Sequence, residues 1–305
     1  MTDGVDSSPL VSVVVPTYYR NDVLRETLRS VRDQSYSPVE VIVVDDSGEG
    51  HAEPVATSFE GVDYVEFDEN RGANDARTAG ARHADGEFVH FLDDDDRMHE
   101  DKLEKQIHIF EEKDQIGVVY TGIWKKGDQI DLPDPSIRGH VLESALAFET
   151  WPCMTSTMLI DAEVLDEALP LSDRAAAQDL ELMIQLARRT EFEYVDEPLL
   201  YKRIDLSSLG SSLTAVECRK QIVGDYRSLY ERYPDRVRER ALARTYESEG
   251  ALLLRKRGWS PRAIAALARH AYYMPDERVK SVGKLLAACF GKTGWKAIRR
   301  VNRVV

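Results

Sequence analysis

Short apolar runs alternate with amphipathic segments through the first 120 residues of the chain. The apolar runs are rich in β-branched residues and predict buried strands over residues 11–15, 39–44, 62–67, 87–92 and 116–120. Between them, apolar residues recur at helical spacing, as Leu24, Leu28 and Val31 do in the first such segment. Strands that alternate with helices predict an α/β fold, with a mostly parallel sheet covered on both faces.

The pattern changes twice further along the chain. Residues 122–149 contain several prolines and glycines and predict an irregular loop region. Beyond it, strands are predicted at 155–160, 192–195 and 199–203, and a helix at 179–189. A Ser-rich loop is expected at 207–214, and the pattern after residue 214 is wholly helical. We therefore expect two domains, residues 1–214 and 215–305.

Charge is unevenly distributed along the chain. The net charge of −14 argues against nucleic acid as a partner, because phosphate backbones attract positive surfaces. A salt-loving host would also explain this acidity. The tail from residue 278 to the end carries +8 and leaves −22 for the rest, since −22 and +8 sum to −14. Such an asymmetry indicates that the tail meets an anionic surface.

Cysteine usage and the N-terminal residues indicate an intracellular protein. Cys153, Cys218 and Cys289 are widely spaced and odd in number, so they suggest neither a disulfide framework nor a zinc site. Free thiols suit a reducing cytoplasm. Residues 1–10 lack the pattern of a signal peptide, and no apolar stretch is long enough to span a membrane. We expect a cytoplasmic location, at the inner face of the cell membrane if the basic tail binds lipid.

An unbroken run of four carboxylates, Asp93 to Asp96, follows the apolar strand that ends at Leu92. Two carboxylates at ~4 Å repel by roughly 4 kcal/mol at an effective dielectric constant near 20, so a cation at the strand end would explain the cluster. In an extended chain Asp93 and Asp95 face the same way and Asp94 faces away. Mg²⁺ favours such carboxylates together with phosphate oxygens. The alternative is a solvated acidic turn in which Asp96 caps the next helix.

Two other polar segments also follow predicted strands. Thr17 ends the first strand, and Asp45 and Asp46 end the second. Because ligands collect at the carboxyl ends of the strands in such sheets, we expect these residues to converge with the acidic run on one edge. That edge is the candidate binding site.

The same residues carry a resemblance to a known family. Four segments, in this order and spacing, resemble family 2 glycosyltransferases of the GT-A fold: 11–18, 43–47, 70–77 and 91–96. The resemblance covers about residues 10–205. It implies a GT-A, doubly wound mixed sheet, with a nucleotide-binding half at about 10–121 and an acceptor half at about 122–214. Residues 215–305 would form a helical C-terminal extension.

The resemblance implies inverting transfer of a sugar from a nucleotide-sugar, usually UDP-linked. By position, its site residues divide into two sets. The nucleotide-binding set is Pro16, Thr17, Tyr18, Asp45, Asp46, Gly72, Arg77 and Asp94, in which Asp46 would read the uracil or ribose. The metal-binding set is Asp93 and Asp95, which would hold a divalent metal, Mg or Mn. The segment from Gln178 to Leu182 is similar to the family's acidic pair, with Gln in place of the first acid and Asp179 as the catalytic base. Helix capping is the alternative role for Asp179.

The implied acceptor is a glycan or lipid-linked saccharide, in cell-surface polysaccharide synthesis or protein glycosylation. Basic amphipathic patterns in the tail predict peripheral membrane contact through residues 278–305, and packing on the catalytic domain is the alternative. Two other functions stay open, a non-catalytic nucleotide-sugar-binding partner subunit and a nucleotidyltransferase.

Overall fold

The computed structural model describes residues 8–127, 129–203, 212–274 and 277–301, and the chain forms two compact units. The first unit comprises residues 1–142, 150–173 and 178–204. The second comprises residues 143–149, 174–177 and 205–305. The predicted boundary near residue 214 stays a prediction, and two short segments from earlier in the chain belong to the C-terminal unit.

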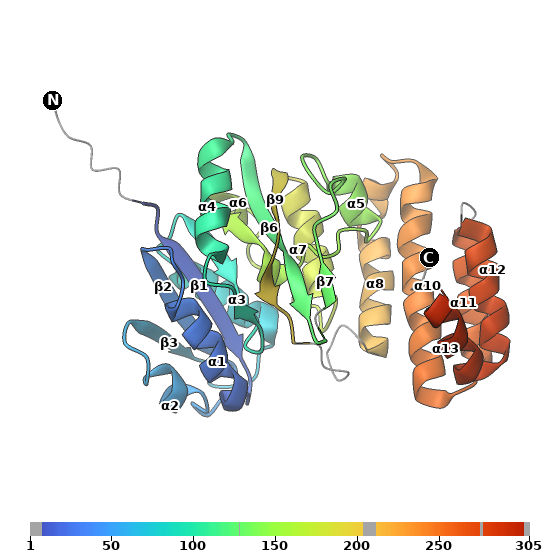
Figure 1. The fold of residues 1–305 in the computed structure, drawn as a ribbon, viewed down its shortest axis with the longest axis horizontal. Helices are drawn as coiled ribbons and strands as arrows, with labels where there is room; N and C mark the ends of the chain where they lie inside the picture. The colour runs from blue at the N-terminus through green and yellow to red at the C-terminus, as the bar shows by residue number, and fades with distance from the viewer. Residues whose placement is uncertain (1–7, 128, 204–211, 275–276, 302–305) are drawn as a thin grey trace. The chain divides into compact units, whose positions relative to one another are not determined.

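One mixed sheet forms the centre of the first unit (Figure 1). Its strands are β1 Val11–Thr17, β2 Val39–Asp45, β3 Val62–Glu66, β4 Phe88–Phe91, β5 Arg97–Met98, β6 Ile116–Lys125, β7 Gln129–Asp131, β8 Leu159–Asp161 and β9 Glu191–Tyr201. They lie in the order β3-β2-β1-β4-β8-β6-β9-β5, with β7 paired to β6. β1 to β4 are parallel, and β6 runs parallel to β9. β8 is antiparallel to both β4 and β6, so the carboxyl ends of β1, β2, β4, β6 and β9 lie at one edge.

Helices cover both faces of this sheet. They are α1 Asn21–Arg32, α2 Glu53–Ala56, α3 Ala73–His83, α4 Lys102–Glu112, α6 Ala162–Asp166 and α7 Gln178–Ala187, whereas α5 Leu142–Leu146 belongs almost wholly to the second unit. Val13 and Val15 of β1 pack with Leu24 of α1 in one core cluster. The next side chain along β1, Val14, faces α3, where Gly80 leaves no room for a Cβ. The predicted two-sided α/β sheet is therefore confirmed.

Three local predictions differ from the structure. Residues 155–157 form a turn of 3₁₀ helix before β8, where one continuous strand was expected. The two short strands predicted at 192–203 are a single strand, β9, whose register shifts near Pro198. The irregular region 122–149 contains the end of β6, then β7 and α5. Most of the loop predicted at 207–214 lies outside the described residues.

The second unit is helical, as the pattern predicts. It holds α8 Leu213–Asp225, α9 Arg227–Tyr230, α10 Asp235–Arg257, α11 Pro261–Tyr273, α12 Arg278–Cys289 and α13 Gly291–Val301. Its core contains Leu253, Leu254, Leu267 and Trp295. The indole of Trp295 is thus packed inside this unit, whereas Leu286 of α12 is 60% exposed. No helix in the described part of the chain is long and apolar enough to span a bilayer.

Candidate active site

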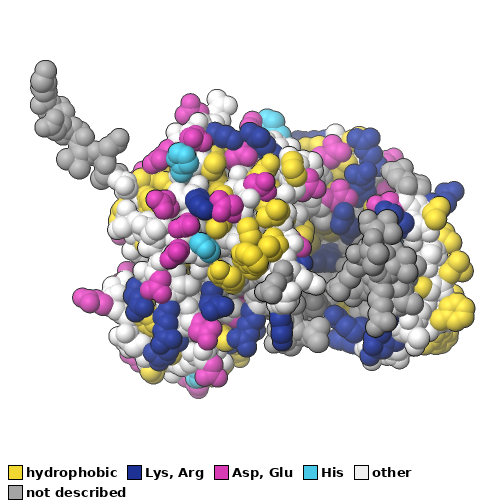
Figure 2. Space-filling view, viewed as in Figure 1, with side chains coloured by type: hydrophobic (Ala, Val, Ile, Leu, Met, Phe, Trp, Pro, Cys, Tyr) yellow, Lys and Arg dark blue, Asp and Glu magenta, His cyan; other side chains and the backbone are white. Residues whose placement is uncertain are grey.

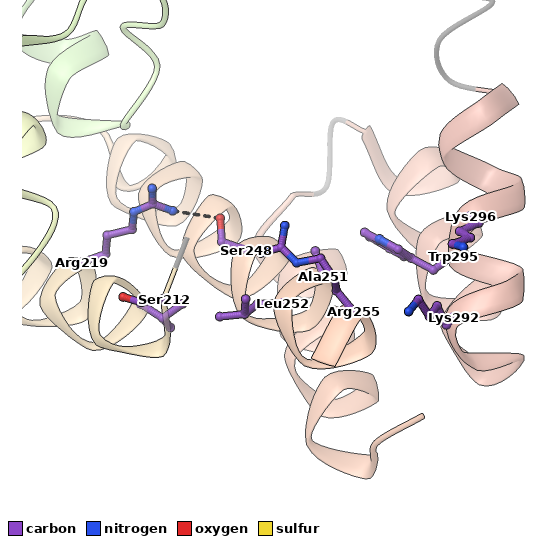
Figure 3. A pocket seen from close by; sticks show the side chains of 10 residues that line it. Ser212, Arg219, Ser248, Ala251, Leu252, Arg255, Lys292, Trp295 and Lys296 are labelled. Carbon is purple, nitrogen blue, oxygen red and sulfur yellow. Dashed lines mark hydrogen bonds between the residues drawn. The ribbon is translucent and has the colours of Figure 1, made fainter. Parts of the chain in front are cut away.

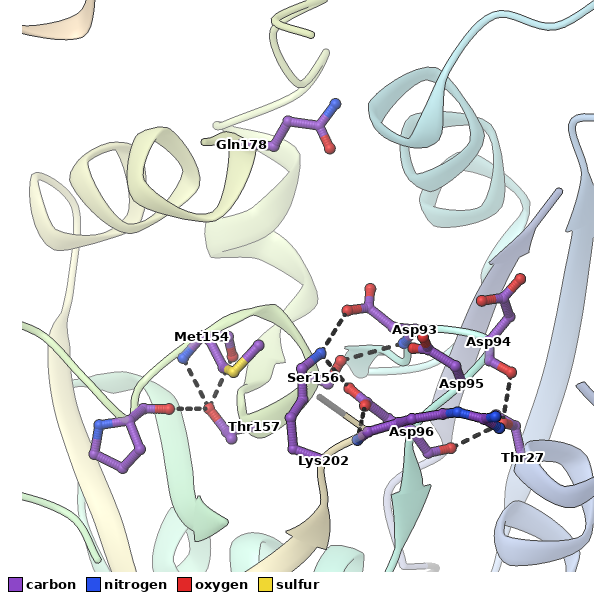
Figure 4. Close-up of polar contacts among 12 residues, drawn as sticks. Thr27, Asp93, Asp94, Asp95, Asp96, Met154, Ser156, Thr157, Gln178 and Lys202 are labelled. Carbon is purple, nitrogen blue, oxygen red and sulfur yellow. Dashed lines mark hydrogen bonds and ion pairs between the residues drawn. The ribbon is translucent and has the colours of Figure 1, made fainter. Parts of the chain in front are cut away.

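The four consecutive aspartates form a turn at the carboxyl end of β4 (Figure 4). The backbone N–H of Asp96 donates to the carbonyl of Asp93 at 3.0 Å, which closes the turn. The Thr27 hydroxyl of α1 lies 2.8 Å from the carbonyl oxygens of both Asp94 and Asp96. The expected extended conformation is therefore wrong, and so is the capping role of Asp96, because α4 begins after Asp101. The turn still brings carboxylate oxygens of Asp93, Asp95 and Asp96 within 4.8 Å of one another.

Three cationic side chains surround the acidic turn. Arg77 of α3 lies 2.7 Å from Asp93. Lys202, just after β9, bridges Asp93 at 3.1 Å and Asp96 at 2.7 Å, as Figure 4 shows. Arg20, just before α1, contacts Asp95 at 2.7 Å and Asp94 at 3.3 Å. These contacts offset much of the mutual repulsion within the turn.

The carboxylates of the turn differ in their proton affinity. Burial opposes the charge on Asp93, but Lys202 and Arg77 outweigh it and lower the pKa of Asp93. Burial raises the pKa of Asp94 to about 6, although Arg20 and Thr17 counteract it. Burial also raises the pKa of fully buried Asp96, against the pull of Lys202. Of these three carboxylates, Asp93 is the most firmly ionised.

The donor set of the turn fits a hard divalent cation. Ca²⁺ and Mg²⁺ bind carboxylate oxygens at about 2.0–2.6 Å, so two ligands of one ion lie at most about 4–5 Å apart. The oxygens of Asp93, Asp95 and Asp96 all lie within 4.8 Å of one another and so meet this limit. Asp93 and Asp95 are the predicted metal-binding pair, and Asp96 is a third candidate ligand that the sequence interpretation did not include.

Arg77 connects the acidic turn to the start of α7. The residue is only 8% exposed, and its guanidinium donates hydrogen bonds to Asp93, Asn74 and Gln178, the last at 3.1 Å. Gln178 is the first residue of α7, and the predicted base Asp179 follows it. Asp179 therefore lies inside the helix, not at its cap, and is half-buried. The Gln that replaces the expected first acid accepts a hydrogen bond from Arg77.

The two aspartates at the end of β2 are buried and hold the surrounding loops. Asp45 is fully buried and accepts hydrogen bonds from the backbone of Ala52 at 2.6 Å and the hydroxyl of Tyr64 at 2.8 Å. These bonds give Asp45 a structural role at the end of β2, and its contact with a nucleotide stays a prediction. Asp46 accepts from the backbone N–H groups of Arg71 at 2.6 Å and Gly72 at 2.9 Å. Contact of Asp46 with a nucleotide stays a prediction.

Gly72 precedes α3 with a φ of 93°, a conformation that favours glycine. Asp46 therefore fixes the start of the helix that carries Arg77 to the acidic turn.

The residues after β1 lie at the same edge. The Thr17 hydroxyl donates to Asp94 at 2.9 Å, so two predicted nucleotide-binding residues are in contact. Pro16 is buried within β1, and Tyr18 is 50% exposed. The edge thus combines a buried polar contact with an exposed aromatic ring.

Sequence reasoning missed Arg20, Ser156 and Lys202. Ser156 accepts the backbone N–H of Asp93 at 3.2 Å. The position of Lys202 directly after a predicted strand was the one available signal for it, because strand ends collect functional groups in such sheets. Arg20 and Ser156 carried no signal in the sequence pattern.

Solved structures share this fold. The structure of S. aureus TarS 1–349 in complex with UDP-GlcNAc matches with a TM-score of 0.63 and 17% identity, covering 96% of this chain and 91% of that chain. The mannosyltransferase PcManGT from Pyrobaculum calidifontis, in complex with GDP-Man and Mn²⁺, matches with a TM-score of 0.60 and 20% identity, covering 97% and 88%. The fold is therefore that of GT-A glycosyltransferases.

Sequence similarity identifies the family. Residues 12–167 match glycosyl transferase family 2. The putative teichuronic acid biosynthesis glycosyltransferase TuaG of Bacillus subtilis is 30% identical over 212 residues, which are 67% of this chain and 82% of that protein. The uncharacterized glycosyltransferase RP339 of Rickettsia prowazekii is 25% identical over 290 residues, 89% of this chain and 86% of that one. The chain belongs to glycosyl transferase family 2 and is a glycosyltransferase.

Proposed function

We propose that this enzyme is a metal-dependent, inverting glycosyltransferase that uses a UDP-sugar. The observation that carries the proposal is the acidic turn at the carboxyl edge of the sheet, joined through Arg77 to the start of α7. The UDP-GlcNAc complex of TarS and the Mn²⁺ complex of PcManGT support the donor and the metal. TuaG, named for teichuronic acid biosynthesis, supports a cell-surface glycan or lipid-linked saccharide as acceptor.

In this proposal Asp179 accepts the proton of an acceptor hydroxyl as the oxygen attacks the anomeric carbon. A carboxylate is a weak base for an alcohol, so the proton moves late, as the new bond forms. Asp93 and Asp95, with Asp96 in reach, would hold a divalent ion that offsets negative charge on the departing UDP. Arg77 fixes both Asp93 and the α7 terminus, which positions Asp179 relative to the donor.

Two substitutions test these roles. Asp179→Asn is expected to keep UDP binding and to reduce transfer by about 10²-fold or more, because the base is lost. Asp95→Asn is expected to weaken Mn²⁺-dependent binding of UDP as well. The measurements are release of UDP from a panel of UDP-sugars with saccharide acceptors, and the thermal shift caused by UDP with Mn²⁺.

Asp114→Asn is the matched control, since Asp114 is exposed between α4 and β6 and should leave both readouts unchanged. Near-normal turnover by Asp179→Asn would refute the base assignment. Release of pyrophosphate instead of UDP would favour the nucleotidyltransferase, and UDP binding without any release would favour the partner subunit.

We also propose that the outer face of α12 contacts an anionic membrane. The helix carries Val279, Val282 and Leu286 at helical spacing, and Phe290 follows its last residue; they are 88%, 39%, 60% and 79% exposed. Figure 2 shows hydrophobic atoms on the surface of the helical unit where α12 lies in Figure 1. Exposed Arg278 and Lys280 lie on the same helix, and apolar side chains flanked by cations suit an anionic lipid surface.

Full-length Leu286→Ser/Phe290→Ser is expected to lose most binding to vesicles that contain anionic lipid. Ile130→Ser/Leu132→Ser is the control, because it removes two side chains that are 43% and 49% exposed in the first unit. Equal partitioning of the two double variants would refute membrane contact through α12. Removal of the whole tail would be less informative, because Trp295 belongs to the core of the helical unit.

A further inference from the structure

A cavity of about 390 Å³ lies within the helical unit, among α8, α10 and α13 (Figure 3). Four cationic side chains line it: Arg219, Arg255, Lys292 and Lys296. Among the described residues that line the cavity, none is acidic. Lys292 and Lys296 come from the basic tail, but Arg219 and Arg255 lie outside it, in the part of the chain that carries −22.

The two lysines of α13 occupy positions where their positive charge is locally unfavourable. Lys292 lies in the first turn of α13, where the positive end of the helix dipole disfavours a cation. Lys296 follows four residues later, and like charges at this spacing repel. Within the described part of the chain, neither lysine forms an ion pair, nor does Arg255. Arg255 alone would be ordinary, because cations are favourable in the last turn of a helix such as α10.

The other lining residues and the volume of the cavity suit a ligand larger than an inorganic anion. Arg219 donates to the Ser248 hydroxyl at 2.9 Å, which fixes the guanidinium between α8 and α10, as Figure 3 shows. The ring of Trp295 points from α13 toward Ala251 and Arg255 of α10. A volume of about 390 Å³ is within the range of about 300–1,000 Å³ that is typical of small-molecule sites. It leaves room for an organic group attached to the anion.

We propose that this cavity binds a phosphate ester. The phosphate oxygens lie among the two arginines and the two lysines, which donate charge-assisted hydrogen bonds to them. The esterified organic group lies against the indole of Trp295. The ester is either a soluble metabolite or the headgroup of a phospholipid, since both present the same phosphate chemistry. The proposal does not depend on the transfer reaction proposed above.

The first test measures binding of sn-glycerol 3-phosphate to the full-length protein by calorimetry, at low salt and with EDTA, so that no divalent metal contributes. Lys292→Gln/Lys296→Gln is expected to weaken binding at least tenfold. Lys126→Gln/Lys256→Gln removes the same charge from two exposed lysines that do not line the cavity, and should change binding less than twofold. Thermal midpoints of the three proteins verify that each is folded, and Arg255→Gln provides a second, independent cavity variant.

The second test distinguishes the two sources of the phosphate. The same proteins, each also carrying Leu286→Ser/Phe290→Ser so that α12 does not contribute, are sedimented with phosphatidylcholine vesicles that contain or lack phosphatidic acid. Selective loss of vesicle binding in Lys292→Gln/Lys296→Gln assigns the site to a lipid headgroup, whereas loss of glycerol 3-phosphate binding alone assigns it to a soluble ester. Equal weakening by both double variants, or no binding of either probe to the unmodified protein, overturns the proposal. Release of UDP by Lys292→Gln/Lys296→Gln, measured separately, is expected to be unchanged.

Discussion

A single buried arginine sets much of the geometry of the candidate active site. Arg77 is 8% exposed and joins Asp93 of the acidic turn to Gln178 of α7. A carboxylate in place of Gln178 would add a further negative charge beside Asp93, whereas the neutral amide accepts a hydrogen bond without it. The departure from the family's acidic pair therefore preserves the contact with Arg77 and adds no charge to the cluster.

Lys102 is a second residue whose burial has a measurable consequence. It is fully buried at the start of α4 and donates to Gln106 at 2.7 Å. Burial lowers the pKa of Lys102 well below its ordinary value of 10.5. Between that lowered pKa and 10.5 the unfolded chain binds more protons than the folded one, so this residue makes stability rise with pH.

We expect Lys102→Met to raise the free energy of unfolding by about 1 kcal/mol at pH 7, because the cost of burying the amine, either charged or stripped of its proton, is removed at the loss of one hydrogen bond. The gain should shrink as pH approaches 10.5, where the unfolded side chain also loses its proton. Urea unfolding at several pH values measures this difference. Lys126→Met, at an exposed position, should show neither effect, and a constant difference at all pH values would contradict the argument.

The sequence predicted where the residues of the acidic turn lie better than it predicted which residues they contact. Asp93 and Asp95 follow an apolar strand, and that order alone placed them at the carboxyl edge of the sheet. The cations could not be predicted, because Arg77 and Lys202 are brought to Asp93 from 16 and 109 residues away. The hydrogen bonds that Asp45 accepts from Ala52 and Tyr64 likewise had no signal in the sequence, because they form only when the loop after β2 folds back and β3 pairs with β2.

At the scale of elements, one buried carboxylate ties three helices of the second unit together. Glu249 of α10 is 3% exposed and pairs with Lys220 of α8 at 3.0 Å and Arg262 of α11 at 2.7 Å. Burial opposes its charge, but both cations outweigh burial and lower the pKa of Glu249. Its contribution is therefore present above its ordinary pKa of 4.5 and is lost as pH falls through the lowered pKa.

Glu249→Gln is expected to lower the free energy of unfolding at pH 7 by about 2 kcal/mol. The two cations lose their ion pairs with a buried carboxylate, and hydration compensates only part of that loss. The difference from the unmodified protein should diminish at acidic pH. Denaturant unfolding followed by circular dichroism measures both. Glu217→Gln is the matched control, since Glu217 contacts the same two cations but its side chain is 54% exposed. A loss of the same size in that variant would count against burial as the cause.

Long periodic elements were predictable, and short or interrupted ones were not. The spacing of Leu24, Leu28 and Val31 fixes α1, because each of these side chains faces the same core. The segment 155–160 has strand-like composition, yet Thr157 bonds to the backbone of Met154 and bends it into a 3₁₀ turn. Pairing with β6 across a register shift carries β9 past Pro198, and this long-range effect has no local signal.

At the scale of the whole molecule, the excess of negative charge weakens the folded state. The net charge of −14 produces self-repulsion in the compact chain, which salt screens over a Debye length of about 8–10 Å near physiological ionic strength. The charge is also polarised along the sequence, since the tail from residue 278 carries +8 against −22 elsewhere. Screening relieves repulsion within the acidic majority of the chain more than it weakens the attraction to the short tail.

We therefore expect 0.5 M NaCl, against 0.05 M, to stabilise the protein at pH 7.5 by about 1 kcal/mol, or about 2–4 °C in thermal midpoint for a unit of this size. The internal control is pH, because near the sequence pI of 5.1 the net charge vanishes and screening has little repulsion to relieve. Differential scanning calorimetry at both pH values makes the comparison. A shift of equal size at pH 5.1 and pH 7.5 would assign the effect to general salting-out of apolar surface instead of to charge.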